Sequence, residues 1–191
     1  MPPSAKFTRE EIISAALSIV REKGFEALTA RALGMKLNSS SRPIFTVFQS
    51  MDEVQSEVMN AARELYNTYI RKGLSQKSKF KCVGEQYITF AMKEPKLFQL
   101  LFMQEQDNLP SVTGVLPLID SNYEEILLSI QEEYGLDRPT AYNLYRHLWI
   151  YTHGIAVLCT TRMCQFTGEE IGKMMSEVCS SLLKQMKGNE K

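Results

Sequence analysis

Hydroxyl and guanidinium side chains gather in one short stretch of the chain. Ser40 and Ser41 stand directly before Arg42, and Thr46 follows about one helical turn later. Hydroxyl and guanidinium groups commonly bond phosphate oxygens, and threonine can also contact a base edge or the methyl group of thymine. The types and order of these residues predict a surface that binds nucleic acid.

A short helix is expected to present these groups. Proline is tolerated in the first turn of a helix, so Pro43 places the start of this helix at about Ser40 or Ser41. At a helix start, free backbone N–H groups and the positive end of the helix dipole attract phosphate. Ile44 and Phe48 are four residues apart and share a face, which we expect to hold the helix to a small core.

Two further helices are predicted before this one. Thr8 and Glu11 have the spacing of a capping box at the start of the first helix. Thr29 is a good N-cap for the second helix, and its hydroxyl and backbone N–H could contact a phosphate beside Arg31. Three short helices, the last two joined by a polar turn at residues 38–41, match a helix-turn-helix, whose third helix enters the major groove of DNA.

The rest of the chain is also predicted to be helical. Apolar residues recur at helical spacing, and no strand-like alternation is present, which makes the chain all-α with about nine helices. After the short third helix, the expected helical segments cover residues 50–73, 79–93, 95–103, 117–134, 137–164 and 167–187. The largest irregular segment is expected at residues 105–114.

Composition narrows the possible classes of protein. Hydrophobic residues make up 44% of the chain and charged residues 23%, which is typical of a soluble globular protein. Acidic and basic residues balance at 22 each, but residues 1–50 carry seven Lys or Arg against four Glu, the sign that a DNA-facing segment needs. No apolar run reaches the ~18 residues that span a membrane, and no signal peptide is evident, so we expect a cytoplasmic protein without a membrane partner.

No catalytic residues, metal ligands or cofactors are predicted. The chain has no glycine-rich phosphate loop, no HExxH and no GxSxG motif, so an enzyme is a weak alternative. His147 and His153 are six residues apart and do not share a helical face, which makes them poor joint metal ligands. The four cysteines are expected to be reduced and packed; a redox-sensing pair of Cys159 and Cys164 is the alternative, although a spacing of five puts them on different faces of a helix.

The N-terminal part of the sequence resembles a known family. Residues 8–55 are similar to the N-terminal domain of TetR-family regulators, through Ala15-Ala16, Gly24-Phe25, Leu28-Thr29, Leu33-Gly34-Met35, the run from Ser40 to Phe48, and Ser50-Met51-Asp52-Glu53. The resemblance implies that Ser41, Arg42, Phe45, Thr46 and Val47 lie on the side that faces DNA. It also implies a helix-turn-helix DNA-binding domain over residues 1–51 and a helical ligand-binding and dimerisation domain over residues 52–191.

The sequence departs from the family at two positions. Phe45 stands where the family often carries tyrosine, whose hydroxyl commonly contacts a phosphate, and Met51 stands where lysine is usual. Both departures predict a weaker electrostatic contact with DNA. Each missing phosphate contact also makes the negative slope of log affinity against log salt concentration less steep by about one.

The last two helices are predicted to form a dimer interface. Apolar residues recur along both in a heptad-like stripe, and pairing with a second copy would make a four-helix interface. A homodimer also places two recognition helices on one face of a palindromic operator. The predicted interface residues are Leu148, Tyr151, Ile155, Leu158, Met175, Val178 and Leu182. The alternative is that both stripes are buried within one subunit.

Aromatic residues and methionines between residues 87 and 153 predict a pocket for a small apolar effector. Residues of this kind more often build a core, but Met and Phe also suit an adaptable cavity. The predicted pocket residues are Tyr87, Phe90, Phe98, Met103, Tyr123, Trp149 and His153. For His153 the alternative is a hydrogen-bonded core histidine.

Together these features favour a ligand-responsive repressor that binds double-stranded DNA as a homodimer. Ligand binding would shift the long helix at residues 50–73 and change the separation of the recognition helices, which requires the ligand to prefer one arrangement energetically. A hundredfold loss of operator affinity corresponds to ~2.7 kcal/mol of coupling. The competing hypothesis is a helical adaptor that binds protein and has no affinity for DNA.

Overall fold

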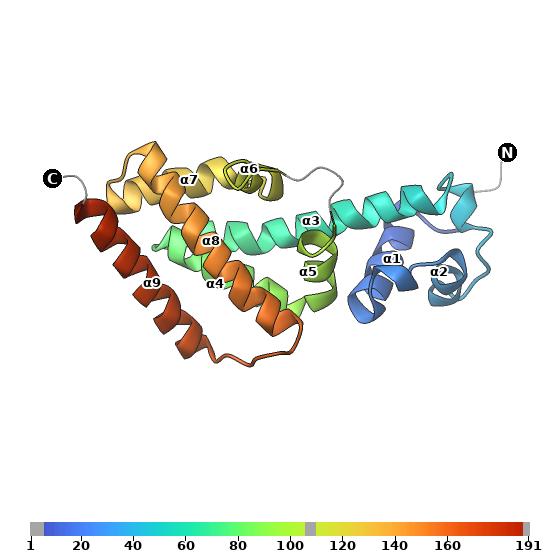
Figure 1. Cartoon of the computed structure of the whole chain (residues 1–191). Coiled ribbons are helices and arrows are strands. Elements are labelled where there is room, and N and C mark those ends of the chain that lie inside the picture. The colour runs from blue at the N-terminus through green and yellow to red at the C-terminus, as the bar shows by residue number, and fades with distance from the viewer. Residues whose placement is uncertain (1–5, 106–109, 189–191) are drawn as a thin grey trace. The chain divides into compact units, whose positions relative to one another are not determined.

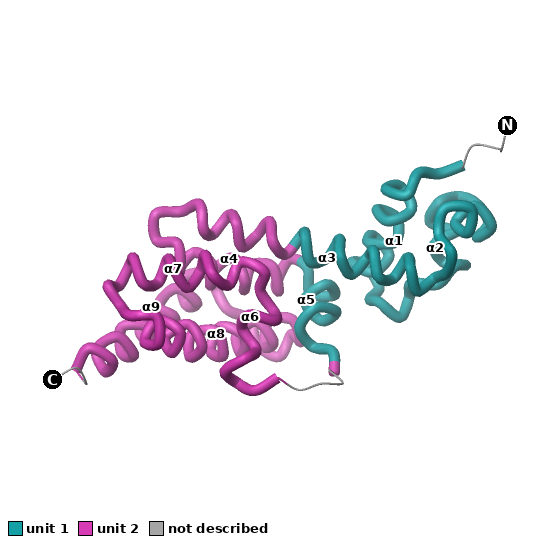
Figure 2. Tube along the Cα trace, turned by 90° about the horizontal axis from the view of Figure 1, so that it is seen from above, with its two compact units in different colours: residues 1–65, 94–104 teal, residues 66–93, 105–191 magenta. Residues whose placement is uncertain are grey.

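The computed structural model describes residues 6–105 and 110–188. Within them the chain forms nine α-helices and two 3-10 helices and no strand, which confirms the all-α prediction (Figure 1). The chain divides into two compact units (Figure 2). Unit 1 comprises residues 1–65 and 94–104, and unit 2 comprises residues 66–93 and 105–191. This division differs from the predicted boundary after residue 51, because α3 (Met51–Leu74) contributes residues to both units and α5 (Pro95–Phe102) belongs to unit 1.

Unit 1 begins with α1 (Arg9–Lys23), η1 (Phe25–Ala27) and α2 (Ala30–Lys36). The Thr8–Glu11 capping box is present, and Thr29 caps α2 by accepting the Ala32 N–H at 3.1 Å. The helices enclose a core of fully buried apolar side chains, Ile12, Ala16, Val20, Leu33, Ile44, Val54 and Val58. Helix α5 packs against α1, where Arg21 Nε donates to the buried carboxylate of Glu94 at 2.7 Å.

The predicted third helix is a single 3-10 segment, η2 (Ile44–Thr46). The Ile44 N–H donates to Ser41 O at 3.1 Å and the Thr46 N–H to Pro43 O at 3.2 Å, which is the i to i+3 pattern of a 3-10 helix. The α-helix is cut short because Ser50 already caps the next helix, accepting the Glu53 N–H at 3.2 Å. The segment is therefore a tight turn rather than the short α-helix that Pro43 indicated.

Unit 2 contains the C-terminal part of α3 together with α4 (Lys79–Lys93), α6 (Val115–Ile119), α7 (Tyr123–Tyr134), α8 (Arg138–Thr160) and α9 (Gly168–Gly188). Helix α8 packs against α4, α7 and α9 and so organises the unit. Helix α4 has the predicted bounds, whereas α8 ends at Thr160, short of the predicted Cys164.

The helix predicted over residues 117–134 is two helices. Asp120 lies at the break, where its carboxylate Oδ1 accepts the backbone N–H of Asn122 at 2.8 Å and so closes a local turn. Helix α7 ends at Tyr134, and Gly135, which has a left-handed φ of 67°, caps it. Asp137 caps α8 by accepting the Thr140 N–H at 2.9 Å.

Candidate functional site

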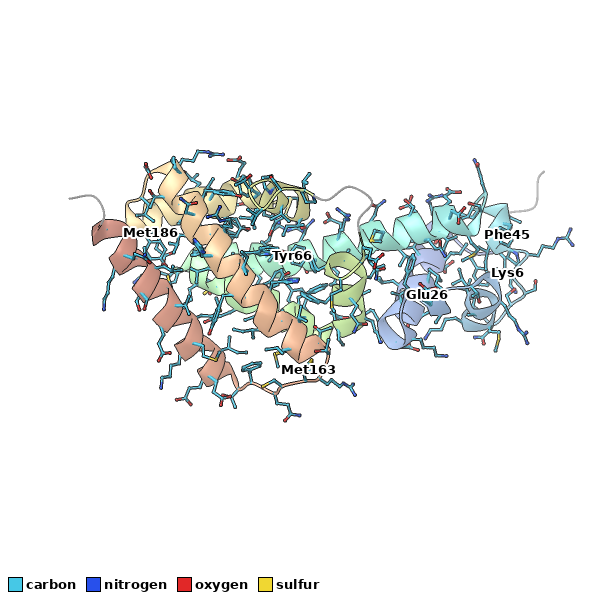
Figure 3. The ribbon with its side chains drawn as sticks, in the orientation of Figure 1. Lys6, Glu26, Phe45, Tyr66, Met163 and Met186 are labelled. Atoms are coloured by element: carbon cyan, nitrogen blue, oxygen red, sulfur yellow. The ribbon has the colours of Figure 1, made fainter. Side chains whose placement is uncertain are left out.

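A polar surface on unit 1 carries the residues predicted to contact DNA. Six of the eight predicted residues are exposed and two, Ser41 and Val47, are half-buried. The exposed six are Thr29, Arg31, Ser40, Arg42, Phe45 and Thr46. We call these eight residues the polar surface; Figure 3 labels Phe45 on it. Ile44 and Phe48 are buried beneath it, as their spacing indicated.

Gly34 of α2 sets how closely the turn at residues 38–41 can approach. A β-carbon on Gly34 would lie 2.9 Å from both Ser40 C and Ser41 N. Asn38 adopts a left-handed φ of 51° at the start of the same turn. The backbone of Ser40 and Ser41 is therefore packed directly on α2, which fixes where Arg42 leaves the surface.

Arg9 of α1 links α3 to Phe48, which is buried beneath the polar surface. Its guanidinium donates to Glu53 at 2.9 Å and to Glu57 at 2.7 Å, and it lies 4.3 Å from the ring centroid of Phe48. The Gln49 backbone N–H and, after it, Arg9 lower the pKa of Glu53, so that carboxylate stays charged near neutral pH.

Thr46 donates its hydroxyl to Pro43 O at 2.6 Å, which stabilises η2 while the threonine oxygen can still accept a hydrogen bond.

Unit 2 contains a cavity of about 220 Å³ that is partly open to solvent. Its walls come from α3, α4, α7, α8 and α9 and from Asp120 beside α6. Most of the lining is apolar or aromatic, and the ring-bearing residues are Tyr66, Phe80, Tyr87, Tyr134, Tyr145 and Trp149. Tyr66, labelled in Figure 3, is the first α3 residue of unit 2.

Two of the seven predicted pocket residues, Tyr87 and Trp149, line this cavity. Three more contact residues of the lining. Phe90 lies edge-to-face with Tyr66 at a centroid distance of 5.4 Å, and Tyr123 stacks on Tyr145 at 6.0 Å. His153 is hydrogen-bonded to the Tyr87 hydroxyl. Phe98 and Met103 are not among the lining residues. They belong to unit 1, because α5 packs against α1.

The hydrogen bonds of His153 fit the alternative of a core histidine. Its Nδ1 lies 2.9 Å from the Tyr87 hydroxyl, and its ring stacks on Trp149 at a centroid distance of 5.3 Å. Burial lowers the pKa of His153, so the imidazole is neutral near pH 7. The Trp149 indole Nε1 is buried and has no acceptor in hydrogen-bonding geometry. Burial raises the pKa of Tyr87, and the nearby Trp149 indole opposes part of that rise.

Asp120 is the acidic residue in the lining, and the sequence prediction missed it. Its side chain is buried, and its Oδ2 accepts the Tyr66 hydroxyl at 2.9 Å. Burial first, and the charge of Asp120 second, raise the pKa of Tyr66 and of Tyr145 well above the ordinary tyrosine value. Both hydroxyls therefore stay protonated, and that of Tyr66 donates to Asp120. A lone acidic residue directly after the apolar run 115–119 was the available signal in the sequence.

The seven residues predicted for the dimer interface divide into two groups. Leu148, Ile155 and Met175 are buried inside unit 2, where Ile155 and Met175 pack with Ile88 and Ile171. They are covered by this chain's own helices, because α8 packs against α4 and α9. The other four are half-buried: Tyr151, Leu158, Val178 and Leu182.

Other kinds of site find little support in the described residues. No group of three His, Cys, Asp or Glu there is placed to hold a metal ion. The four cysteines are unpaired; Cys159 is half-buried, and burial raises the pKa of its thiol, whereas Cys164 is exposed. None of the helices in the same ranges has the length and apolar character needed to cross a bilayer.

Comparison with known proteins identifies the family. Residues 80–178 match the model of a tetracyclin repressor-like C-terminal domain, which covers more than half of the 191 residues and runs from α4 into α9. None of the curated proteins matches the chain. Members of this family are regulators and generally not enzymes. The matching domain and the all-helical architecture show that the chain belongs to the TetR family of regulators.

Proposed function

We propose that the protein is a DNA-binding transcriptional regulator that responds to a small molecule. The observation that carries the proposal is the polar surface, which presents Arg31, Arg42 and Thr46 to solvent on a unit joined to a TetR-like body. Arginine and hydroxyl groups on one face suit contacts to phosphates and base edges. The protein would act on operator DNA, and so in the cytoplasm, as a repressor.

The proposal includes a homodimer formed through α8 and α9. The outward face of α8 carries Ile150, whose side chain is 48% exposed, followed at helical spacing by the exposed Gly154 and the half-buried Leu158. A β-carbon on Gly154 would meet nothing within 4 Å, so this part of α8 can be approached closely. A two-fold dimer would place two polar surfaces on a palindromic operator.

The ligand would bind in the cavity of unit 2 and act on α3. Tyr66 of α3 lines the cavity and bonds Asp120, and α3 also contributes its first residues to unit 1. A ligand that alters this bond would favour one position of α3 over another. Such a preference is what a change in operator affinity requires.

A DNA-binding titration tests the proposal. Fragments upstream of the protein's own gene are screened by gel shift, and the retained fragment is titrated by fluorescence anisotropy with wild type, Arg42→Ala and Arg63→Ala. Arg63 is an exposed arginine of unit 1 outside the polar surface and serves as the matched control. We expect Arg42→Ala to weaken binding about tenfold or more and Arg63→Ala to leave it near wild type. If no fragment is retarded at low salt, the DNA-binding proposal fails and the helical adaptor takes its place.

A further inference from the structure

The buried carboxylate of Asp120 has no cationic partner among the residues that the structure describes. Its side chain is only 5% exposed, and its three hydrogen bonds come from neutral groups: the Tyr66 hydroxyl, the Asn122 backbone N–H and the Asn122 amide at 3.2 Å. A carboxylate can accept about four hydrogen bonds, so acceptor capacity remains. A buried charge without a counter-ion is destabilising unless a ligand supplies one.

Aromatic rings surround the same space. Tyr66 and Tyr87 meet edge-to-face at a centroid distance of 6.0 Å, and Phe80 and Tyr145 at 5.9 Å, and all four line the cavity together with Asp120. The faces of such rings attract cations, most strongly where water is excluded. The negative charge of Asp120 also raises the pKa of Tyr66 and of Tyr145, after the larger effect of burial, which keeps both rings uncharged.

Lys81 is the one cationic residue among those that line the cavity, and it does not neutralise Asp120. Its side chain is 51% exposed and lies 3.8 Å from Glu85 on the next turn of α4. An exposed, paired ammonium group is screened by solvent and salt. Lys81 is therefore not a counter-ion for Asp120.

We propose that the cavity binds a small organic cation, with a protonated or quaternary amine at Asp120 and an apolar or aromatic body between the rings. The inference rests on the proposed ligand-responsive function and names the chemical class of the effector. The ligand is compact, because about 220 Å³ is less than the roughly 300–1,000 Å³ of sites for drug-sized molecules. Its amine competes with Tyr66 for Asp120 and so acts directly on α3.

Trp149 provides the measurement, because it is the single tryptophan of the chain and lines the cavity. Its fluorescence is titrated with benzyltrimethylammonium and 2-phenylethylamine as cations, 2-phenylethanol as a neutral compound of similar size and phenylacetate as an anion. We expect at least one cation to bind about tenfold or more tightly than the neutral and anionic compounds. Equal or weaker binding of both cations overturns the inference.

The Asp120→Asn variant tests the role of the carboxylate. Asparagine keeps the size but only one of the two acceptor oxygens, so it can serve the Tyr66 hydroxyl or Asn122 but not both. It also removes the charge, so we expect cation affinity to fall about tenfold and the preference over 2-phenylethanol to disappear. Glu125→Gln removes an exposed carboxylate of α7 and is the matched control, with cation affinity expected to stay at the wild-type value. Wild-type cation affinity in Asp120→Asn contradicts the inference.

Thermal unfolding shows whether Asp120→Asn still folds. Without ligand we expect its Tm to lie within a few degrees of wild type, because the loss of an uncompensated buried charge offsets the loss of one acceptor oxygen. A lower Tm with unchanged cation affinity would make Asp120 a purely structural residue and overturn the inference.

Operator binding separates this inference from the proposed function. If a cation binds and operator affinity does not change, the inference that the cavity binds cations is supported, and the proposed ligand response is contradicted. If operator affinity responds only to neutral or anionic compounds, the regulatory function stands and the inference about cations fails.

Discussion

Gly34 controls the geometry of the polar surface although it has no side chain to contact DNA. The atoms that a β-carbon would meet at 2.9 Å are backbone atoms of Ser40 and Ser41, which cannot rotate away. Any larger residue must push the turn from α2 and move Arg42 with it. The close packing of the turn on α2 therefore requires glycine at residue 34.

We expect Gly34→Ala to lower the free energy of unfolding by about 1–3 kcal/mol, because overpacking displaces backbone. Urea unfolding measures this loss, and anisotropy measures the accompanying loss of affinity for the operator fragment. Gly172→Ala in α9 is the matched control, since its β-carbon would meet nothing within 4 Å. Alanine there should leave stability unchanged or raise it by about 0.5–1 kcal/mol. A Gly34→Ala protein as stable as wild type would show that the turn is not held by this contact.

At the scale of elements, α8 is the helix on which unit 2 depends. It packs against α4, α7 and α9, and Tyr145, Leu148, Trp149 and Thr152 on it line the cavity. Its first turn is held by the carboxylate of Asp137, which accepts the Thr140 N–H at 2.9 Å. Hydrogen bonding by Thr140, first from its side chain and then from its backbone N–H, lowers the pKa of Asp137 below its ordinary value.

We expect Asp137→Ala to lower Tm by a few degrees at pH 7, because the first turn of α8 loses its cap. The pKa of Asp137 is lower in the folded than in the unfolded protein, so its contribution is present above the unfolded pKa and is lost as pH falls through the folded value. The Tm difference between wild type and Asp137→Ala should therefore shrink below about pH 4.

Asp137→Ser is the control for this experiment, because a serine hydroxyl can cap the helix without a charge. Its Tm should lie near that of wild type at pH 7 and should show no acid dependence from this position. A constant difference between wild type and Asp137→Ala from pH 7 to pH 3 would contradict the assignment to the carboxylate.

At the scale of the whole molecule, the proposed dimer explains the exposed apolar residue on α8. Ile150 is 48% exposed and precedes Gly154 on the outward face of the helix. Leu128 on α7 is similarly exposed at 53% but lies on neither helix of the proposed interface. The two residues therefore form a matched pair for a test of oligomeric state.

We expect wild type and Leu128→Glu to sediment as dimers at micromolar concentration, and Ile150→Glu to shift toward the monomer. Two buried glutamates facing each other across a two-fold axis would repel, and each would lose its hydration. Operator affinity should fall with the dimer. A wild-type monomer, or an Ile150→Glu protein that still dimerises like wild type, removes α8 from the proposed interface.

The sequence by itself determined most of the elements of this protein. The all-α class, the bounds of α4, and the caps at Thr8, Thr29 and Asp137 follow from apolar spacing and from side chains that bond the backbone within a few residues. These interactions are local, so they can be read along the chain. The exposure of Arg42 and Thr46 and the burial of Ile44 and Phe48 agree with the pattern of the turn for the same reason.

Only the tertiary structure decided which faces meet. It reduced the expected third helix to the 3-10 segment η2, buried Leu148 and Ile155 within the chain, and assigned Phe98 to unit 1. It also brought Asp120 to Tyr66, 54 residues apart in sequence, inside an aromatic cavity. An apolar stripe predicts that one face of a helix is buried. It does not say which element buries that face, because packing partners come from distant parts of the chain.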